Sequence, residues 1–241
     1  MVAEAVPQLV CSTIRENRAS CSGWDETPGH TMRCPLYQTD RCPLPVSPEE
    51  KQAQRSGFLG RVGFRKRYCS PDLEGLFGTK ADPAAEACRA LLREYWGAIE
   101  QNLASGLGFI LSGTVGTGKT YALALTALAA NWTGATIRYI YSPDLFDLLH
   151  SADERLSLYR SADLLLLDDF GAQHDTDWHV SGFNALMEAR HAAELSTCIT
   201  TNLSKEALDR AEPYRRSIDR WRETCAHMIV LGFDSLRGYK P

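Results

Sequence analysis

From residue 82 onward, the apolar positions alternate between a helical period and short uninterrupted runs. The stretch 83–103 has helical spacing, with Asp82 and Pro83 suited to its first turn and apolar side chains at Ala85, Cys88, Leu92, Tyr95 and Ile99. Apolar runs typical of buried strands cover residues 107–113, 136–142, 162–171, 196–202 and 226–233. Helical patterns lie between them at 119–130, 143–152, 180–193 and 214–221. This alternation predicts an α/β fold with a parallel sheet covered by helices on both faces.

The first 70 residues differ from the rest of the chain. Pro, Ser, Thr and Gly are frequent there, and no helical or strand period persists. Because such a stretch has few apolar side chains to bury, it needs a stabilising cross-link, such as a bound metal, to become ordered. We therefore predict two units, a small N-terminal segment at residues 1–66 and a larger domain at residues 67–241. A basic cluster, RVGFRKR at residues 61–67, lies at their junction.

Composition narrows the choice of function. The 241-residue chain has a net charge of −4, which disfavours nucleic-acid binding by bulk positive charge. The first 70 residues contain ten basic and seven acidic residues, and the other 171 contain 16 and 23, so the positive excess is local. No apolar run reaches the roughly 18 residues of a spanning helix, and no secretory leader is evident at the start. We expect a cytoplasmic protein.

A phosphate-binding loop is the strongest motif. The string GTVGTGKT matches G-x-x-x-x-G-K-[ST] in full, between a predicted strand and a predicted helix. Its glycines let backbone N–H groups face phosphate oxygens, and the helix adds its positive N-terminal end. We expect Lys119 to reach the terminal phosphates and Thr120 to join a Mg²⁺ shell. The predicted ATP-binding residues are Gly113, Thr114, Val115, Gly116, Thr117, Gly118, Lys119 and Thr120.

An acidic pair follows about 50 residues later. Four leucines predict a buried strand, and Asp168 and Asp169 come at its carboxyl end, where open α/β sheets bind ligands. Asp168 is predicted to bind Mg²⁺ with Thr120. Asp169 is predicted to orient the attacking water, although glutamate, with its longer reach, is commoner at that position in such ATPases. The two motifs together indicate a P-loop NTPase.

Two further features point to one branch of these ATPases. Asn202 ends the strand after the acidic pair, and the chain continues with YRRSIDRW and LRGYK. Together with LSGTVGTGKT and LLLLDDFGAQ, these motifs resemble the DnaC/DnaI helicase-loader branch of the AAA+ ATPases, related to the IstB transposition ATPases. The resemblance covers roughly residues 67–241. It implies a sensor role for Asn202, an arginine finger acting in a neighbouring subunit for Arg220, with Arg216 as a rival, and a γ-phosphate contact for Arg237.

Four N-terminal cysteines form a second candidate metal site. Cys11, Cys21, Cys34 and Cys42 are spaced more widely than the close pairs of ordinary zinc modules. A segment with little core-forming power still favours a metal staple, so Zn²⁺ is the first choice. An iron–sulfur cluster or reduced thiols without metal remain alternatives. A similarly placed cysteine-rich domain in some loaders engages the helicase.

The resemblance implies an ATP-dependent loader or remodeller of a hexameric replicative helicase on single-stranded DNA during replication initiation. It implies self-association, since the finger acts in trans, and central-channel DNA contacts at Thr176 and Trp178. Trp178 packing against the next helix is the competing interpretation of that residue. An IstB-like transposition helper and a nucleotide-dependent adaptor with negligible hydrolysis are the competing interpretations of the whole chain.

Overall fold

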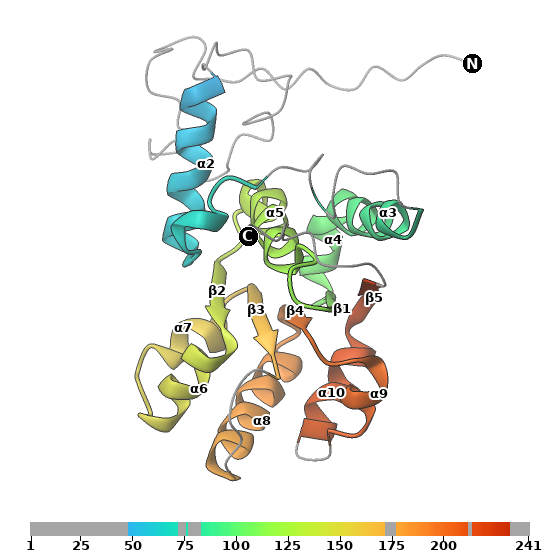
Figure 1. Cartoon of the computed structure of the whole chain (residues 1–241). Helices are drawn as coiled ribbons and strands as arrows, with labels where there is room; N and C mark the ends of the chain where they lie inside the picture. The colour runs from blue at the N-terminus through green and yellow to red at the C-terminus, as the bar shows by residue number, and fades with distance from the viewer. Residues whose placement is uncertain (1–47, 72–75, 77–82, 172–176, 212–213, 232–241) are drawn as a thin grey trace, which may run out of the picture.

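The computed structural model describes residues 48–71, 76, 83–171, 177–211 and 214–231. A five-stranded sheet lies at its centre, in the order β2-β3-β4-β1-β5, and each neighbouring pair of strands is parallel. The strands are β1 (Gly108–Gly113), β2 (Ile137–Tyr141), β3 (Leu164–Phe170), β4 (Ser196–Thr201) and β5 (Cys225–Leu231). The predicted α/β class and parallel sheet are confirmed (Figure 1).

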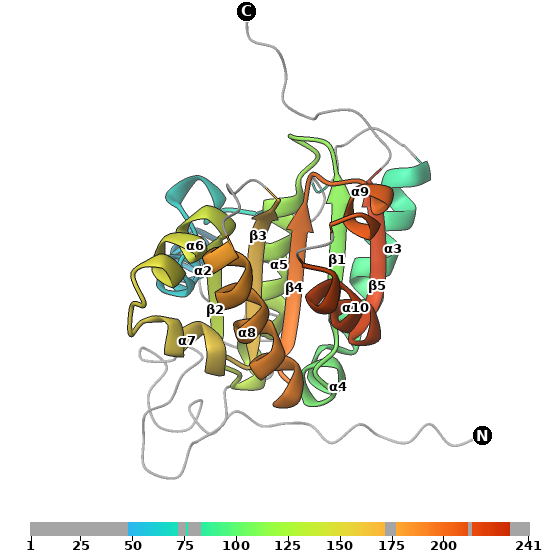
Figure 2. The same cartoon turned by 90° about the horizontal axis from the view of Figure 1, so that it is seen from below.

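Helices cover both faces of the sheet, as Figure 2 shows. One face carries α2 (Pro48–Val62), α3 (Pro83–Gly97) and α5 (Lys119–Ala130). The other face carries α6 (Ser142–His150), α8 (Asp177–Ala192) and α10 (Arg215–Glu223). Shorter elements are α4 (Ile99–Ala104), α7 (Leu156–Ser161), α9 (Lys205–Asp209) and the 3₁₀ turns η1 (Lys66–Tyr68) and η2 (Asn131–Thr133).

The leucine run of β3 is buried from both sides. Leu164 and Leu166 belong to the apolar core under α5, whereas Leu165 and Leu167 belong to the core under α8. All four side chains have no exposed surface. Because successive side chains of a strand point to opposite faces, an uninterrupted apolar run fits a strand with helices on both sides. The polar residues that follow the run are thereby delivered to the carboxyl edge of the sheet.

The helix α2 and the residues after it pack on the same core. Phe58, Leu59, Val62 and Phe64 are buried together with Tyr139 of β2. Thus the described part of the stretch predicted as an N-terminal segment, residues 48–66, lies against the sheet. The chain leaves α2 at Gly63, which has φ of +119°, and a Cβ there would lie 2.9 Å from the carbonyl oxygen of Tyr139. A glycine is needed for so close an approach of two backbones.

A buried guanidinium ties together the edge of the sheet opposite the phosphate-binding loop. The side chain of Arg190, near the end of α8, has no exposed surface. It donates hydrogen bonds to the carbonyl oxygens of Tyr159 in α7 and Ala162 just after it, each at 2.7 Å, and of Ser196 in β4 at 2.6 Å. It also donates to the hydroxyl of Thr197 at 3.0 Å. Arg190 therefore joins α8 to the end of α7 and the start of β4.

Among the described residues, none of the helices has the length and apolar character that crossing a bilayer requires.

Candidate functional site

The loop GTVGTGKT lies where the sequence predicts it, between the end of β1 and the start of α5. Gly118 immediately precedes α5 and has φ of +91°, in the left-handed region that favours glycine. The loop thus turns tightly enough to aim the first N–H groups of a twelve-residue helix at the space above the sheet. Those N–H groups and the positive end of the helix form an anion-binding position.

Lys119 is held inside this loop. Its side chain is buried, with 7% of the residue exposed. The ammonium group donates hydrogen bonds to the carbonyl oxygens of Gly113 and Thr114, at 2.7 and 2.8 Å, and to Oδ1 of Asn202 at 2.8 Å. The positive charge is therefore fixed at the mouth of the loop, where phosphate oxygens would compete for it.

Hydroxyl groups surround the Asp168 carboxylate, which is buried at 5% exposure. The hydroxyl of Thr120 in α5 donates to Oδ2 at 2.9 Å, and that of Tyr139 in β2 donates to the same oxygen at 2.8 Å. The hydroxyl of Thr200 in β4 donates to Oδ1. Three different elements thus orient one carboxylate. Burial, followed by the charge and hydrogen bond of Asp168, raises the pKa of Tyr139 far above its usual value, so its hydroxyl remains a donor.

Asp169 stands on a local break in the sheet. The pairing of β3 with β4 shifts between Leu167 and Phe170, and Asp169 has φ of +59°. Its N–H donates to the Thr200 hydroxyl at 2.9 Å. Such an irregularity turns a side chain out of the strand's normal alternation, and aspartate tolerates the left-handed region better than most residues. The Asp169 carboxylate therefore faces the loop in place of being buried in the core.

Asn202 connects the loop to the acidic pair. Its Oδ1 accepts from Lys119 at 2.8 Å, and its Nδ2 donates to Oδ1 of Asp169. One amide thus bridges the cation of the loop and the second carboxylate. The sequence predicts all three residues at the carboxyl edge of the sheet, and the structure brings them together there.

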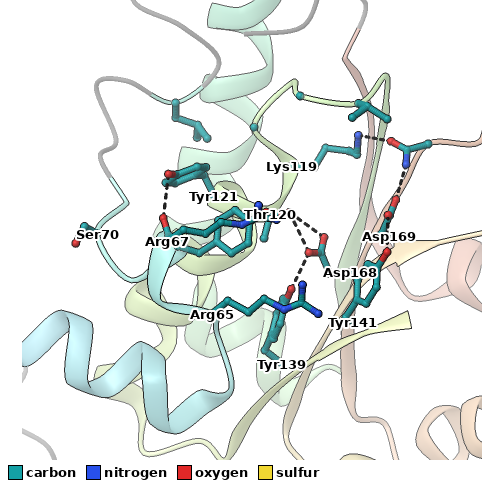
Figure 3. Close-up of a pocket in the computed structure, with 16 residues that line it drawn as sticks. Arg65, Arg67, Ser70, Lys119, Thr120, Tyr121, Tyr139, Tyr141, Asp168 and Asp169 are labelled. Carbon is teal, nitrogen blue, oxygen red and sulfur yellow. Dashed lines mark hydrogen bonds between the residues drawn. The ribbon is translucent and has the colours of Figure 1, made fainter. Parts of the chain in front are cut away.

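These residues line a pocket of about 740 Å³. One wall consists of the loop, Asp168, Asp169 and Asn202, and the opposite wall comes from the junction after α2 (Figure 3). The second wall was not predicted from the sequence as part of the nucleotide site. Its residues and their neighbours in the pocket are Arg65, Arg67, Tyr68, Ser70, Leu76, Tyr121, Tyr139 and Tyr141.

Aromatic contacts hold this second wall together. Tyr68 meets Tyr121 edge to face at 5.4 Å between ring centroids, and the Arg67 guanidinium lies 4.5 Å from the Tyr68 ring centroid. The Tyr121 hydroxyl donates to the backbone carbonyl of Arg67 at 3.1 Å. Arg65 lies over Tyr141, 5.4 Å from its ring centroid. The basic cluster predicted at 61–67 therefore contributes two arginines to the pocket.

The donor set fits Mg²⁺ bound with nucleotide phosphates. Mg²⁺ prefers hard oxygen ligands, keeps several waters and uses one or two protein groups together with substrate phosphates. Thr120 Oγ1 and the Asp168 carboxylate meet this description and already lie in contact. Within the part of the chain that the structure describes, no group of three or more His, Cys, Asp or Glu residues is arranged to hold a metal by itself.

Comparison with known proteins finds a family whose members resemble this part of the chain. Residues 100–211, which contain the loop, the acidic pair and Asn202, match the family described as IstB-like ATP binding protein. This part of the chain is similar to IstB-like ATP-binding proteins. The match runs from α4 to α9 and ends before helix α10, which carries Arg216 and Arg220.

Relatives resemble the chain over a longer stretch than that family match. The replicative helicase loader DnaC of Buchnera aphidicola subsp. Schizaphis graminum (strain Sg) is 26% identical over 203 residues, 79% of each chain. The replicative helicase loader DnaI of Bacillus subtilis (strain 168) is 23% identical over 176 residues. That alignment covers 69% of this chain and 55% of the DnaI chain. A crystal structure of the DnaC helicase loader has a TM-score of 0.56 at 22% identity, covering 69% of this chain and 99% of that one. The predicted resemblance to the DnaC/DnaI branch is confirmed.

The remaining predicted residues fall into two groups. Arg220 lies in α10 and forms an ion pair with Glu188 of α8, and Arg216 is exposed on the same helix. Trp178 lies in the first turn of α8. Those outside the described residues are Cys11, Cys21, Cys34, Cys42, Thr176 and Arg237. Their predicted roles stay predictions.

Removing the loop cation is expected to weaken nucleotide binding. A hydrogen bond to a charged group contributes about 1.5–3 kcal/mol, so Lys119→Ala should raise the dissociation constant of a fluorescent ATP analogue about 10- to 100-fold. Lys205→Ala, which removes an exposed lysine at the start of α9, is the matched control and should bind like the unaltered chain. Equal affinities for the two variants would show that Lys119 does not contact the phosphates.

Proposed function

We propose that this chain is an ATP-dependent loader or remodeller of a replicative DNA helicase in replication initiation. The observation that carries the proposal is the assembly of Lys119, Asp169 and Asn202 in one pocket with the Thr120–Asp168 pair. It supports nucleotide chemistry at this site. The likeness to helicase loaders over 79% of the chain supports the biological setting.

ATP hydrolysis at this pocket would use groups already in place. On nucleotide binding, the Lys119 ammonium exchanges its carbonyl partners for phosphate oxygens. Thr120 and Asp168 would hold Mg²⁺, which would neutralise phosphate charge. Asp169 orients the attacking water and accepts its proton, and the Asn202 amide keeps that carboxylate and Lys119 in a common arrangement.

The site would be completed by a second copy of the chain. The proposed arginine finger is Arg220, because it holds that place in the RSIDRW motif by resemblance to the helicase loaders; its side chain on α10 is about 30% exposed. Arg216 is the alternative. In the single chain Arg220 pairs with Glu188, so the finger is held on its own surface. An arginine supplied in trans accelerates related phosphoryl transfers about 10³-fold or more, which predicts slow turnover before assembly.

The other proposed contacts complete this assignment. Thr176 and Trp178 would contact single-stranded DNA in the central channel of the assembly. Arg237 would contact the γ-phosphate. The cysteines of residues 1–66 would hold Zn²⁺, and this segment would engage the helicase.

A pull-down tests the assignment. The full chain, with its zinc and iron content measured, is expected to retain a hexameric replicative helicase in an ATP-dependent manner. Lys119→Ala should make retention independent of ATP. Retention of a transposase with no binding of the helicase would contradict a loader and favour a transposition helper. Helicase retention with no phosphate release, even on single-stranded DNA, would instead favour an adaptor.

A further inference from the structure

A tyrosine hydroxyl from a neighbouring strand holds the carboxylate that the proposed function assigns to Mg²⁺. Strands β2 and β3 are adjacent and parallel, with Tyr139 beside Leu166 and Tyr141 beside Asp168. From this register the Tyr139 side chain crosses to β3, and its hydroxyl donates to Oδ2 of Asp168 at 2.8 Å. Tyr139 is 6% exposed, so water does not compete freely for that bond.

The hydrogen bonds to the Asp168 carboxylate come from two directions, the sheet and helix α5. Tyr139 and Thr200 donate to different oxygens, Oδ2 and Oδ1, and they come from the strands on either side of β3. Thr120 approaches from α5, which follows the phosphate-binding loop. Two donors in the sheet therefore prevent rotation of the carboxylate, and its remaining lone pairs are directed to the pocket where Thr120 lies.

The Tyr139 ring is itself held from outside the sheet. Phe64 stacks on it, with ring centroids 4.0 Å apart and planes inclined by 28°. Phe64 follows Gly63, whose backbone lies against the Tyr139 carbonyl. The Cys69 thiol donates to the Phe64 carbonyl oxygen at 3.6 Å and so supports the same turn. The junction after α2 thus fixes the ring, and the ring fixes the hydroxyl.

We propose that Tyr139 is a positioning residue for Mg²⁺-dependent nucleotide binding, acting by holding the Asp168 carboxylate in its ligand orientation. This inference rests on the proposed function, because it requires that Asp168 serves Mg²⁺ bound with ATP. Groups that orient a metal ligand contribute about 10- to 100-fold in metal affinity, although they do not touch the metal. Because Phe64 stacks on the Tyr139 ring, the junction after α2 also affects the orientation of the Asp168 carboxylate.

The test separates the hydroxyl from the ring. Tyr139→Phe keeps the stack on Phe64 and removes only the hydroxyl. Tyr95→Phe is the matched control, since the Tyr95 hydroxyl is also buried, donates to the Leu107 carbonyl at 2.9 Å and lies outside the pocket. Binding of a fluorescent ATP analogue is measured over a range of Mg²⁺ concentrations and again in EDTA.

Tyr139→Phe is expected to raise the half-maximal Mg²⁺ concentration about tenfold or more, with unchanged nucleotide affinity in EDTA. Tyr95→Phe should match the unaltered chain in both conditions. Phe64→Leu, which keeps the hydroxyl and loosens the ring, should give a smaller rise in the Mg²⁺ midpoint.

Three outcomes would overturn the inference. An unchanged Mg²⁺ midpoint in Tyr139→Phe would show that the hydroxyl does not position Asp168. Equal losses with Mg²⁺ and in EDTA would indicate a purely structural role. Both of these leave the proposed function standing if the unaltered chain binds the analogue in a Mg²⁺-dependent manner. An unaltered chain that binds no nucleotide would overturn the proposed function as well.

Discussion

Replacing Asp169 with asparagine is expected to lower the rate of ATP hydrolysis about 100-fold or more and to leave ATP binding unchanged. A positioned base contributes about 10² to 10⁴ in rate, and an amide cannot accept the proton of the attacking water. The Asp169 carboxylate accepts hydrogen bonds from Asn202 and Tyr141 at the pocket, and Asp169 is not part of the loop predicted to bind the phosphates. Its removal should therefore affect the chemical step and not the affinity.

The backbone makes Asp169→Asn a clean substitution. Asp169 has φ of +59°, and asparagine enters the left-handed region at least as readily as aspartate. The melting temperature should be unchanged, which separates lost chemistry from lost folding. Phosphate release is measured with single-stranded DNA at a protein concentration that permits assembly. A variant rate within threefold of the unaltered chain would remove Asp169 from the role of base.

Replacing Arg190 with leucine is expected to lower the free energy of unfolding by about 3–5 kcal/mol. The substitution leaves the buried carbonyl groups of Ala162 and Ser196, and the partly buried one of Tyr159, without their charged donor, and each such loss is costly. Burial lowers the pKa of the Arg190 guanidinium to about 10, so the side chain still carries its charge at neutral pH. The hydrogen bonds of the guanidinium therefore stay charge-assisted at neutral pH.

Urea unfolding measures this effect. Arg160→Leu, which makes the same exchange at an exposed position in α7, is the control and should change stability by less than about 0.5 kcal/mol. Arg190→Lys keeps a positive charge without the planar fork and should fall between the two. Stability of Arg190→Leu within about 1 kcal/mol of the unaltered chain would contradict the structural role described for Arg190.

The sequence predicts the parts of the site that lie in continuous motifs. Lys119 and Thr120 are specified by the loop, and Asp168 and Asn202 by their place at the ends of apolar runs. Each needs only local spacing and the rule that parallel strands present their carboxyl ends at one edge. The main strands and the helices α3, α5, α6, α8 and α10 are predicted for the same reason, since their apolar periods are local.

The second wall of the pocket and the hydrogen-bond partners of Asp168 could not be predicted in this way. Tyr139 and Thr200 reach Asp168 only because β2 and β4 flank β3, and the apolar periods do not give the order of strands. The sequence predicts both strands, but it does not show whether these two side chains contact Asp168 or only pack in the core. The helix α2 was missed because Gly57 and Gly60 weaken a helical pattern within its fifteen residues.

The close packing at Gly63 also sets where this protein can be divided into exchangeable modules. Phe64, Arg65 and Arg67 follow that glycine and belong physically to the nucleotide pocket or its support, although they precede the phosphate-binding loop by about 50 residues. A chimera that takes the residues up to Gly63 from another protein would replace α2, against which Phe64 and Tyr139 pack. The wall of the pocket that follows Gly63 would then be misaligned. A chimera joined before α2 would transfer the helix, the glycine and this wall together, so the described residues that line the pocket would keep their packing.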